Sequence, residues 1–356
     1  MSMKIRTACY VFVSICFLLA CTSPVKSRPV ATFYVYRFDP PAFVEFSADS
    51  QAIHEIPFSI PPGCGLLDTY PAPLGKFLLI QLSCPNGQTV LFLDTKSGSL
   101  TQPVRDTDSQ FLAWAGDGTS AYFKIDSLNS GRVVRIHTNG KLDNLDLVRW
   151  TYDLSVKPNS ENFTFTFSRG LGAGSELHLS QNHGLRVEKL YADPLNYISF
   201  ARYSPDGSQI AFIKIPDSQT PFTVGELWVM NADGTNARKL ADADAGHGYA
   251  ANWSPDGTQI AFVKRENPDD QSADQSAESL ISNIYVVNVQ HGEVSQVTHF
   301  ARERAETPQW SPDGNTLAFN VVLNGRMEVQ IVELHSGQMR PLLTESACCP
   351  SWIQND

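Results

Sequence analysis

The residues best suited to metal chemistry are acidic and histidine side chains in one short segment. Asp242, Asp244 and His247 lie close together, and Glu306 occupies a comparable place further along the chain. Carboxylate and imidazole groups are common metal ligands. Their spacing matches no established metal-binding loop, however, so the sequence favours solvated carboxylates in turns. It assigns no metal and no cofactor.

A second set of side chains could bind an anion. Arg302 and Arg304 carry guanidinium groups, which hold carboxylates through paired hydrogen bonds, and two tyrosines accompany them. This set could bind an anionic sugar or a peptide carboxylate. We favour the alternative interpretation, in which the arginines form a surface ion network with neighbouring glutamates. The resulting candidate binding mouth comprises Tyr197, His247, Tyr249, Arg302, Arg304 and Glu306.

No catalytic motif accompanies these residues. The chain lacks both the Gly-x-Ser-x-Gly turn of hydrolases and the His-Glu-x-x-His zinc motif. Catalytic residues therefore stay unassigned, and the sequence favours a protein that is not an enzyme. The formal net charge of −10 argues against nucleic-acid binding, which needs a basic patch.

A repeat reveals the elements that position these side chains. An aromatic residue followed by Ser-Pro-Asp-Gly and a short apolar run begins at Tyr203, Trp253 and Trp310. Proline and glycine favour a tight turn, and the apolar run has the length of a strand. A second apolar run and a glycine turn follow each motif, so each unit predicts four short antiparallel strands. Spacing of roughly fifty residues is typical of propellers, solenoids and arrays.

Weaker copies extend the repeat toward the N-terminus and make six complete units. They begin near Tyr70, Trp114 and Val156. The turn glycines mark the units more clearly, at Gly98, Gly140, Gly184, Gly234, Gly292 and Gly337.

The two ends of the chain supply a further unit. The stretch ending at Trp352 matches a first strand, and residues 32–36, 43–46 and 53–56 match the other three. Closing a ring in this way leaves few exposed strand edges. We therefore predict an all-β propeller of four-stranded blades. Seven blades are favoured over six or eight, and a linear β-array or two small sandwiches are the competing architectures.

At these residues the chain resembles the TolB-type β-propeller family, whose WD-like repeats place aromatic-Ser-Pro-Asp-Gly ahead of an Ile-Ala-Phe strand. The motifs cover residues 190–352, and residues 32–190 match by pattern. The resemblance implies a propeller in the cell envelope that serves as a platform for protein contacts, and it transfers no catalytic residues. The repeated aspartates are expected to bond their own turns and the repeated aromatics to pack between blades. These residues are Asp206, Asp256, Asp313, Tyr203, Trp253 and Trp310.

The N-terminus has the features of a targeting segment. Residues 1–21 carry Lys4 and Arg6 near their start and continue with an apolar stretch. They end in Leu-Leu-Ala-Cys21, which is similar to a bacterial lipobox. We expect a cleaved signal peptide and a lipidated Cys21; an ordinary signal peptide or an uncleaved anchor are the alternatives. Residues 22–31 would form a linker and residues 32–356 the propeller. The protein would be exported and anchored to the cell membrane or the outer membrane.

Four cysteines remain in the expected exported domain, where disulfides can form. Cys64 precedes the first strand of one unit and Cys84 ends its second strand, so both fall on one rim and a Cys64–Cys84 bond is favoured. Cys348 and Cys349 lie on the same rim. They could bond each other, one of them could bridge to Cys64, or the thiols could stay free.

Each predicted blade has two unlike ends. The loops that enter the first strand and join the second to the third lie on one face, the loop face. The Pro-Asp-Gly turns lie on the opposite one, the turn face. The candidate binding mouth falls on the loop face, together with a polar insertion at residues 266–282 that we expect to be mobile.

The favoured function is a membrane-anchored scaffold that binds an envelope protein or peptide at the loop face, where binding chemistry concentrates. The alternatives are a channel-mouth enzyme, a lyase or hydrolase acting on carbohydrate or lactone substrates, and a purely structural envelope component. No residue pattern specifies a small-molecule ligand.

Overall fold

The protein is described by a computed structural model. It covers residues 32–47, 51–73, 75–103, 108–126, 132–145, 151–170, 172–181, 186–217, 220, 222–244 and 250–353. The expected signal peptide, the linker and Cys21 lie outside the described residues, as do His247 and Tyr249.

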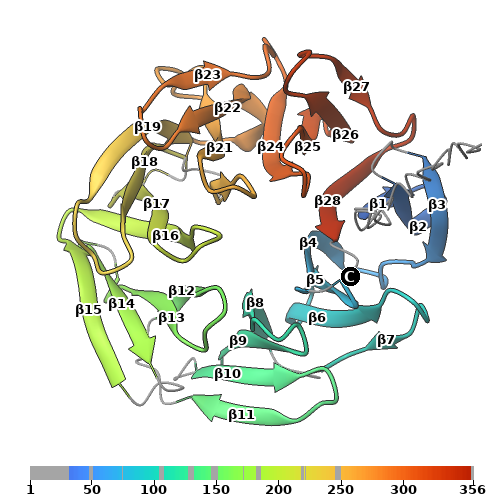
Figure 1. The fold of residues 1–356 in the computed structure, drawn as a ribbon. Helices are drawn as coiled ribbons and strands as arrows, with labels where there is room; N and C mark the ends of the chain where they lie inside the picture. The colour runs from blue at the N-terminus through green and yellow to red at the C-terminus, as the bar shows by residue number, and fades with distance from the viewer. Residues whose placement is uncertain are drawn as a thin grey trace, which may run out of the picture.

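The described strands form a ring of four-stranded antiparallel units (Figure 1). Blade 1 contains β4 (Gly65–Pro71), β5 (Phe77–Cys84), β6 (Gly87–Asp94) and β7 (Leu100–Thr101). Blade 2 contains β8 (Asp108–Trp114), β9 (Ser120–Asp126), β10 (Arg132–His137) and β11 (Leu142–Leu145). Blade 3 contains β12 (Thr151–Val156), β13 (Phe163–Phe167), β14 (Ser175–Gln181) and β15 (Arg186–Asp193).

The second half of the ring continues the pattern. Blade 4 contains β16 (Asn196–Tyr203), β17 (Gln209–Pro216), β18 (Val224–Asn231) and β19 (Arg238–Asp244). Blade 5 contains β20 (Asn252–Trp253), β21 (Gln259–Arg265), β22 (Ser282–Asn288) and β23 (Val294–Gln296). Blade 6 contains β24 (Arg304–Trp310), β25 (Thr316–Leu323), β26 (Arg326–Glu333) and β27 (Met339–Pro341). Blades 5 and 6 share one eight-stranded sheet through a single parallel bridge between Ser282 and Arg304.

Blade 7 is built from both ends of the described chain. Its strands are β28 (Ala347–Ile353), β1 (Thr32–Phe38), β2 (Pro41–Ser47) and β3 (Ala52–Pro57), paired in that order. Phe33 lies opposite Trp352 across the β1–β28 ladder. The predicted closure by one C-terminal and three N-terminal strands is therefore confirmed.

The hydrophobic core lies between blades. Seven buried clusters occur in the described residues, and each joins side chains of two neighbouring blades. Ile210, Ala211 and Phe212 of β17 are all almost fully buried, because the sheet is covered on both faces. A strand covered on both faces needs a continuous apolar run instead of alternation. This explains the repeated Ile-Ala-Phe sequence.

The Pro-Asp-Gly turns are closed by their own side chains. Asp206 accepts hydrogen bonds from the Ser204 hydroxyl at 2.6 Å and the Ser208 amide at 3.0 Å, and Gly207 adopts a φ of 69°. These bonds, the Ser204 bond first, lower the pKa of Asp206 to about 2. The turns at Asp256 and Asp313 repeat the arrangement. The structural role predicted for these aspartates is confirmed.

Indole groups tie the blades together at the turn face. The Trp253 Nε1 donates to the carbonyl of Arg202 in blade 4 at 3.0 Å, and the Trp310 Nε1 donates to the carbonyl of Asn252 in blade 5 at 3.0 Å. Two further boundaries carry the same bond, Trp114 to Tyr70 and Trp352 to Gln309. The prediction that the repeated tryptophans pack between blades is confirmed.

The polar insertion expected to be mobile is instead folded against blades 5 and 6. The buried Arg265 guanidinium donates to the carbonyls of Asn267 and Asp270 and to the Asp274 carboxylate. Ala273 is fully buried, and a short 3-10 helix spans Ala277–Ser279. One buried cation thus organises a segment that looks disordered by composition. No helix in the described part of the chain is long and apolar enough to cross a membrane.

Replacing Trp310 by Phe is expected to destabilise the fold by about 1–3 kcal/mol, because the Asn252 carbonyl loses its donor while the ring volume is largely kept. The measurement is urea-induced unfolding. Trp228→Phe is the matched control, since the Trp228 Nε1 bonds Glu226 within its own blade. Equal effects of the two substitutions would contradict a special role for the inter-blade bond.

Candidate functional site

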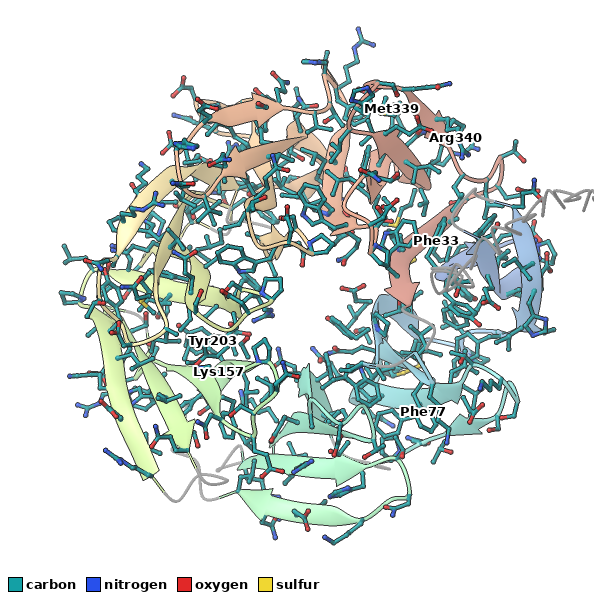
Figure 2. All side chains as sticks on the ribbon, in the orientation of Figure 1. Phe33, Phe77, Lys157, Tyr203, Met339 and Arg340 are labelled. Atoms are coloured by element: carbon teal, nitrogen blue, oxygen red, sulfur yellow. A yellow bond between two sulfur atoms is a disulfide. The ribbon has the colours of Figure 1, made fainter. Side chains whose placement is uncertain are left out.

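The innermost strands of all seven blades surround a central channel with a volume of about 620 Å³. Figure 2 shows side chains projecting around this opening. The lining comes from β4, β8, β12, β16, β20, β24 and β28. A cavity of this size is within the range of ligand sites, and rigid strands rather than loops position its side chains.

Inner strands bulge where they line the channel. Register shifts interrupt β4, β8, β12, β16, β24 and β28. Phe200, Thr307 and Cys349 lie at three of these bulges with φ values of 54°, 49° and 65°. Positive φ is strained for residues with a Cβ, especially β-branched threonine. Such bulges redirect side chains and are frequent beside binding sites.

One wall of the channel is polar. The Arg202 guanidinium donates to Asp153 Oδ1 at 2.8 Å, and the Ala201 amide donates to Asp153 Oδ2 at 2.9 Å. The Tyr152 hydroxyl donates to the Ile198 carbonyl at 2.7 Å. These bonds fix the wall formed by blades 3 and 4. Because Asp153 and Arg202 neutralise each other, this wall offers polar contacts without a net charge.

The wall formed by blades 1 and 2 is aromatic. The Tyr70 and Phe111 ring centroids lie 4.4 Å apart, and the Phe111 and Trp114 centroids lie 6.3 Å apart. All three residues line the channel. The channel is therefore amphipathic, with flat apolar rings on one side and hydrogen-bonding groups on the other.

Asp68 is the channel carboxylate without an ion pair to a described residue. Its Oδ1 accepts the Thr69 amide at 2.8 Å. Enclosure in the channel raises the pKa of Asp68 to about 6, and the nearby Glu306 carboxylate adds to the rise. Enclosure also raises the pKa of the neighbouring Tyr70 hydroxyl, which therefore stays protonated. An approaching cation would relieve the cost of ionising Asp68.

The candidate binding mouth is only partly assembled. Arg304 bonds Glu306 and the Ala277 carbonyl, so its donors are engaged within the protein. Tyr197 packs edge-on against Tyr152 at 6.3 Å. Arg302 is exposed. None of these four predicted residues is among the described residues that line the channel.

A metal centre finds no support in the described residues. Asp242 is ion-paired with Lys239 at 2.6 Å, and Asp244 is buried. No group of three or more suitable ligands occurs among the described side chains.

Sequence reasoning missed the channel residues Asp68, Tyr152, Asp153 and Arg202. They lie within first strands rather than in the loops before them. A signal was present, because Arg202 directly precedes the repeated aromatic Tyr203 in a strand that otherwise buries apolar residues. A charged residue at that place points into the channel.

All four cysteines meet at the boundary of blades 1 and 7. Cys64 and Cys84 form a disulfide with an S–S distance of 2.00 Å, the pairing favoured from the sequence. Cys348 bonds its neighbour Cys349, so neither bridges to Cys64. The cysteines also contribute to the apolar cluster between these blades.

Family models and curated protein sequences give no match to this chain. Solved structures do match it. TolB from Acinetobacter baumannii is 14% identical, with 89% of this chain and 79% of that chain covered and a TM-score of 0.52. An oligogalacturonate lyase from Vibrio parahaemolyticus is 13% identical over 88% of this chain and 86% of that chain, with a TM-score of 0.54. An oligogalacturonate lyase in complex with manganese is 14% identical over 88% and 85%, with a TM-score of 0.56. At these identities the likeness shows the fold alone: the chain folds as a β-propeller similar to those of TolB and the oligogalacturonate lyases.

Proposed function

We propose that this protein is an envelope scaffold that receives an extended segment of a partner protein in its central channel. The amphipathic channel carries this proposal. Aromatic rings on one wall can pack against apolar side chains, while Gln110, Asn252 and Gln309 in the lining offer amide groups to a peptide backbone. The unpaired Asp68 then selects a segment with a cationic side chain.

The position of the N-terminus supports an orientation for this scaffold. Thr32 pairs with Ile353, at the turn-face end of blade 7. Ten residues, 22–31, separate Cys21 from the start of β1. A lipid on Cys21 would therefore hold the turn face toward the membrane. The loop-face opening of the channel would point away from the membrane, where a partner can reach it.

An enzyme acting on carbohydrate is the second candidate. The fold is shared with oligogalacturonate lyases, and an aromatic wall opposite hydroxyl and amide groups also fits a sugar chain. The described residues supply no metal-binding group, and His247 lies outside them. We favour the peptide-binding role because the aromatic rings and amide groups of the described channel are sufficient for it, whereas a metal-dependent enzyme would need ligands from outside the described residues.

Charge reversal at Asp68 tests the binding role. After crosslinking in intact envelopes, the wild-type chain is expected to capture one envelope protein through a segment containing lysine or arginine. Asp68→Arg is expected to reduce this capture at least about tenfold, since it places like charges together. Glu188→Arg, a matched reversal at an exposed position on the outer strand of blade 3, should leave capture unchanged.

The same experiment separates the two candidates. Capture that is unaffected by Asp68→Arg would contradict the channel as the binding site. Absence of capture, together with thermal stabilisation by uronic-acid oligosaccharides and a divalent cation, would establish the carbohydrate alternative instead.

Asp68 also predicts how stability depends on pH. Its pKa of about 6 in the folded protein exceeds the ordinary value of 3.8, so the unfolded chain loses this proton first. Its contribution to stability therefore falls as the pH rises from about 4 to 6 and then stays constant. Asp68→Asn is expected to be more stable than wild type by about 3 kcal/mol at pH 7.5 and equal to it below pH 4, measured by urea unfolding.

Asp206→Asn is the control with the opposite sign. Hydrogen bonds from Ser204 and Ser208 hold the pKa of Asp206 at about 2, so ionised Asp206 stabilises the fold above pH 4. The variant should be less stable than wild type at pH 7.5. If both substitutions change the stability at pH 7.5 in the same direction, enclosure does not determine the pKa of Asp68.

Cys21→Ala tests the proposed anchor. The wild-type chain is expected in the membrane fraction and the variant in the soluble fraction, because one or more acyl chains supply the attachment. Globomycin, which blocks lipoprotein signal cleavage, should cause the unprocessed wild-type chain to accumulate. Membrane retention of the variant that is identical to wild type would overturn lipidation at this residue.

A further inference from the structure

A second hollow, with a volume of about 500 Å³, lies on the turn face at the other end of the channel. Four tryptophans and five prolines line it, and no charged side chain is among the described lining residues. The tryptophan Nε1 groups are used in the inter-blade bonds, so the rings offer mainly apolar surface to a ligand. Grooves lined by aromatic rings bind proline-rich extended segments.

A negative rim borders this hollow on three consecutive blades. Pro205, Pro255 and Pro312 line the hollow, and an exposed aspartate follows each of them. The serine hydroxyls of the turns keep the pKa of Asp206 and Asp256 low, so these carboxylates are ionised at neutral pH. On blade 3 the corresponding turn carries Lys157, whose side chain lies beside Gly207, so a positive charge ends the negative rim there.

The chain enters the propeller beside this hollow. The Phe33 ring centroid lies 4.4 Å from that of Trp352, which lines the hollow. Thr32 pairs with Ile353, the last described residue of the innermost strand of blade 7. The described chain therefore begins at the turn face. Ten residues in a polyproline conformation extend about 30 Å.

The sequence of that segment matches the chemistry of the hollow. Residues 22–31 read Thr-Ser-Pro-Val-Lys-Ser-Arg-Pro-Val-Ala, with Pro24 and Pro29 flanking Lys26 and Arg28. The prolines suit the tryptophan rings, and the two cations suit the aspartate rim. Covalent attachment raises the effective concentration of the segment, so modest affinity is sufficient.

We propose that residues 22–31 bind in the turn-face hollow of their own propeller. Pro24 and Pro29 pack against the tryptophans of blades 5 to 7, and Lys26 and Arg28 face Asp256 and Asp313. The bound segment forms a short, defined connection between Cys21 and the propeller. The hollow shares Asn252 and Gln309 with the channel lining, but contact with residues 22–31 is measured without a channel ligand, so either proposal can fail without the other.

Site-specific photocrosslinking of the full-length chain tests the contact. With p-benzoylphenylalanine in place of Val25, crosslinks are expected within the same chain to peptides that contain Trp253 or Trp310. A mixture of isotopically light and heavy chains distinguishes crosslinks within one chain from those between copies. The same photoreactive residue in place of the highly exposed Leu195, on the loop face, should give none of these products.

Charge reversal probes the ionic part of the proposal. Lys26→Glu combined with Arg28→Glu is expected to lower the crosslink yield about fivefold, the effect of losing two exposed ion pairs. Arg186→Glu combined with Arg340→Glu, at exposed positions on the outer strands of blades 3 and 6, is the matched control and should leave the yield unchanged. Crosslinks that fall on the loop face, on another copy or on another protein would overturn the proposal, as would a yield that charge reversal does not change.

Discussion

Apolar packing between neighbouring blades is the constraint on which the ring depends, and at four of the described boundaries an indole hydrogen bond reinforces it. A four-stranded sheet alone buries little, and each blade gains its core only by packing against the next one. Trp253, Trp310 and Trp352 each donate to a carbonyl of the preceding inner strand and cover the apolar layer beneath. At these boundaries the bond helps to fix the distance and the angle between two successive blades, and the angles of all blades together must close the ring.

Closure of the ring has consequences for the channel. Inner strands converge on the axis, and their bulges turn side chains such as Asp68 and Asp153 toward it. The polar groups of the lining are mostly satisfied by neighbouring blades, as the Arg202–Asp153 pair illustrates. Asp68 departs from this rule, because no described cation neutralises it. An enclosed carboxylate without a neutralising cation lowers the stability of the fold. Such a cost is typical of groups whose role is to bind a ligand.

The repeat in the sequence predicted strand order, closure and the role of the turn aspartates, because each depends on local turn chemistry and on a fixed period. The channel site was not predictable in the same way. Its residues sit inside strands, and only the three-dimensional ring brings Asp68 of blade 1 near Glu306 of blade 6. The insertion at residues 266–282 was misjudged for a related reason: its order comes from the single buried Arg265, which composition does not reveal.

The repeated motif also shapes the surface away from the loops. Its aromatic residues and prolines serve the fold, yet their repetition around an axis gathers them into one hollow bordered by the turn aspartates. Side chains that pack between blades thus also line a surface hollow, because the repeat gathers them around the axis. Unrepeated residues such as Asp68 and Arg202 supply the charged groups of the channel, and the repeated aromatic residues and prolines dominate the turn face. The chain consequently has two chemically distinct ends, and the position of Thr32 assigns the end built from the repeats to the side from which the chain enters.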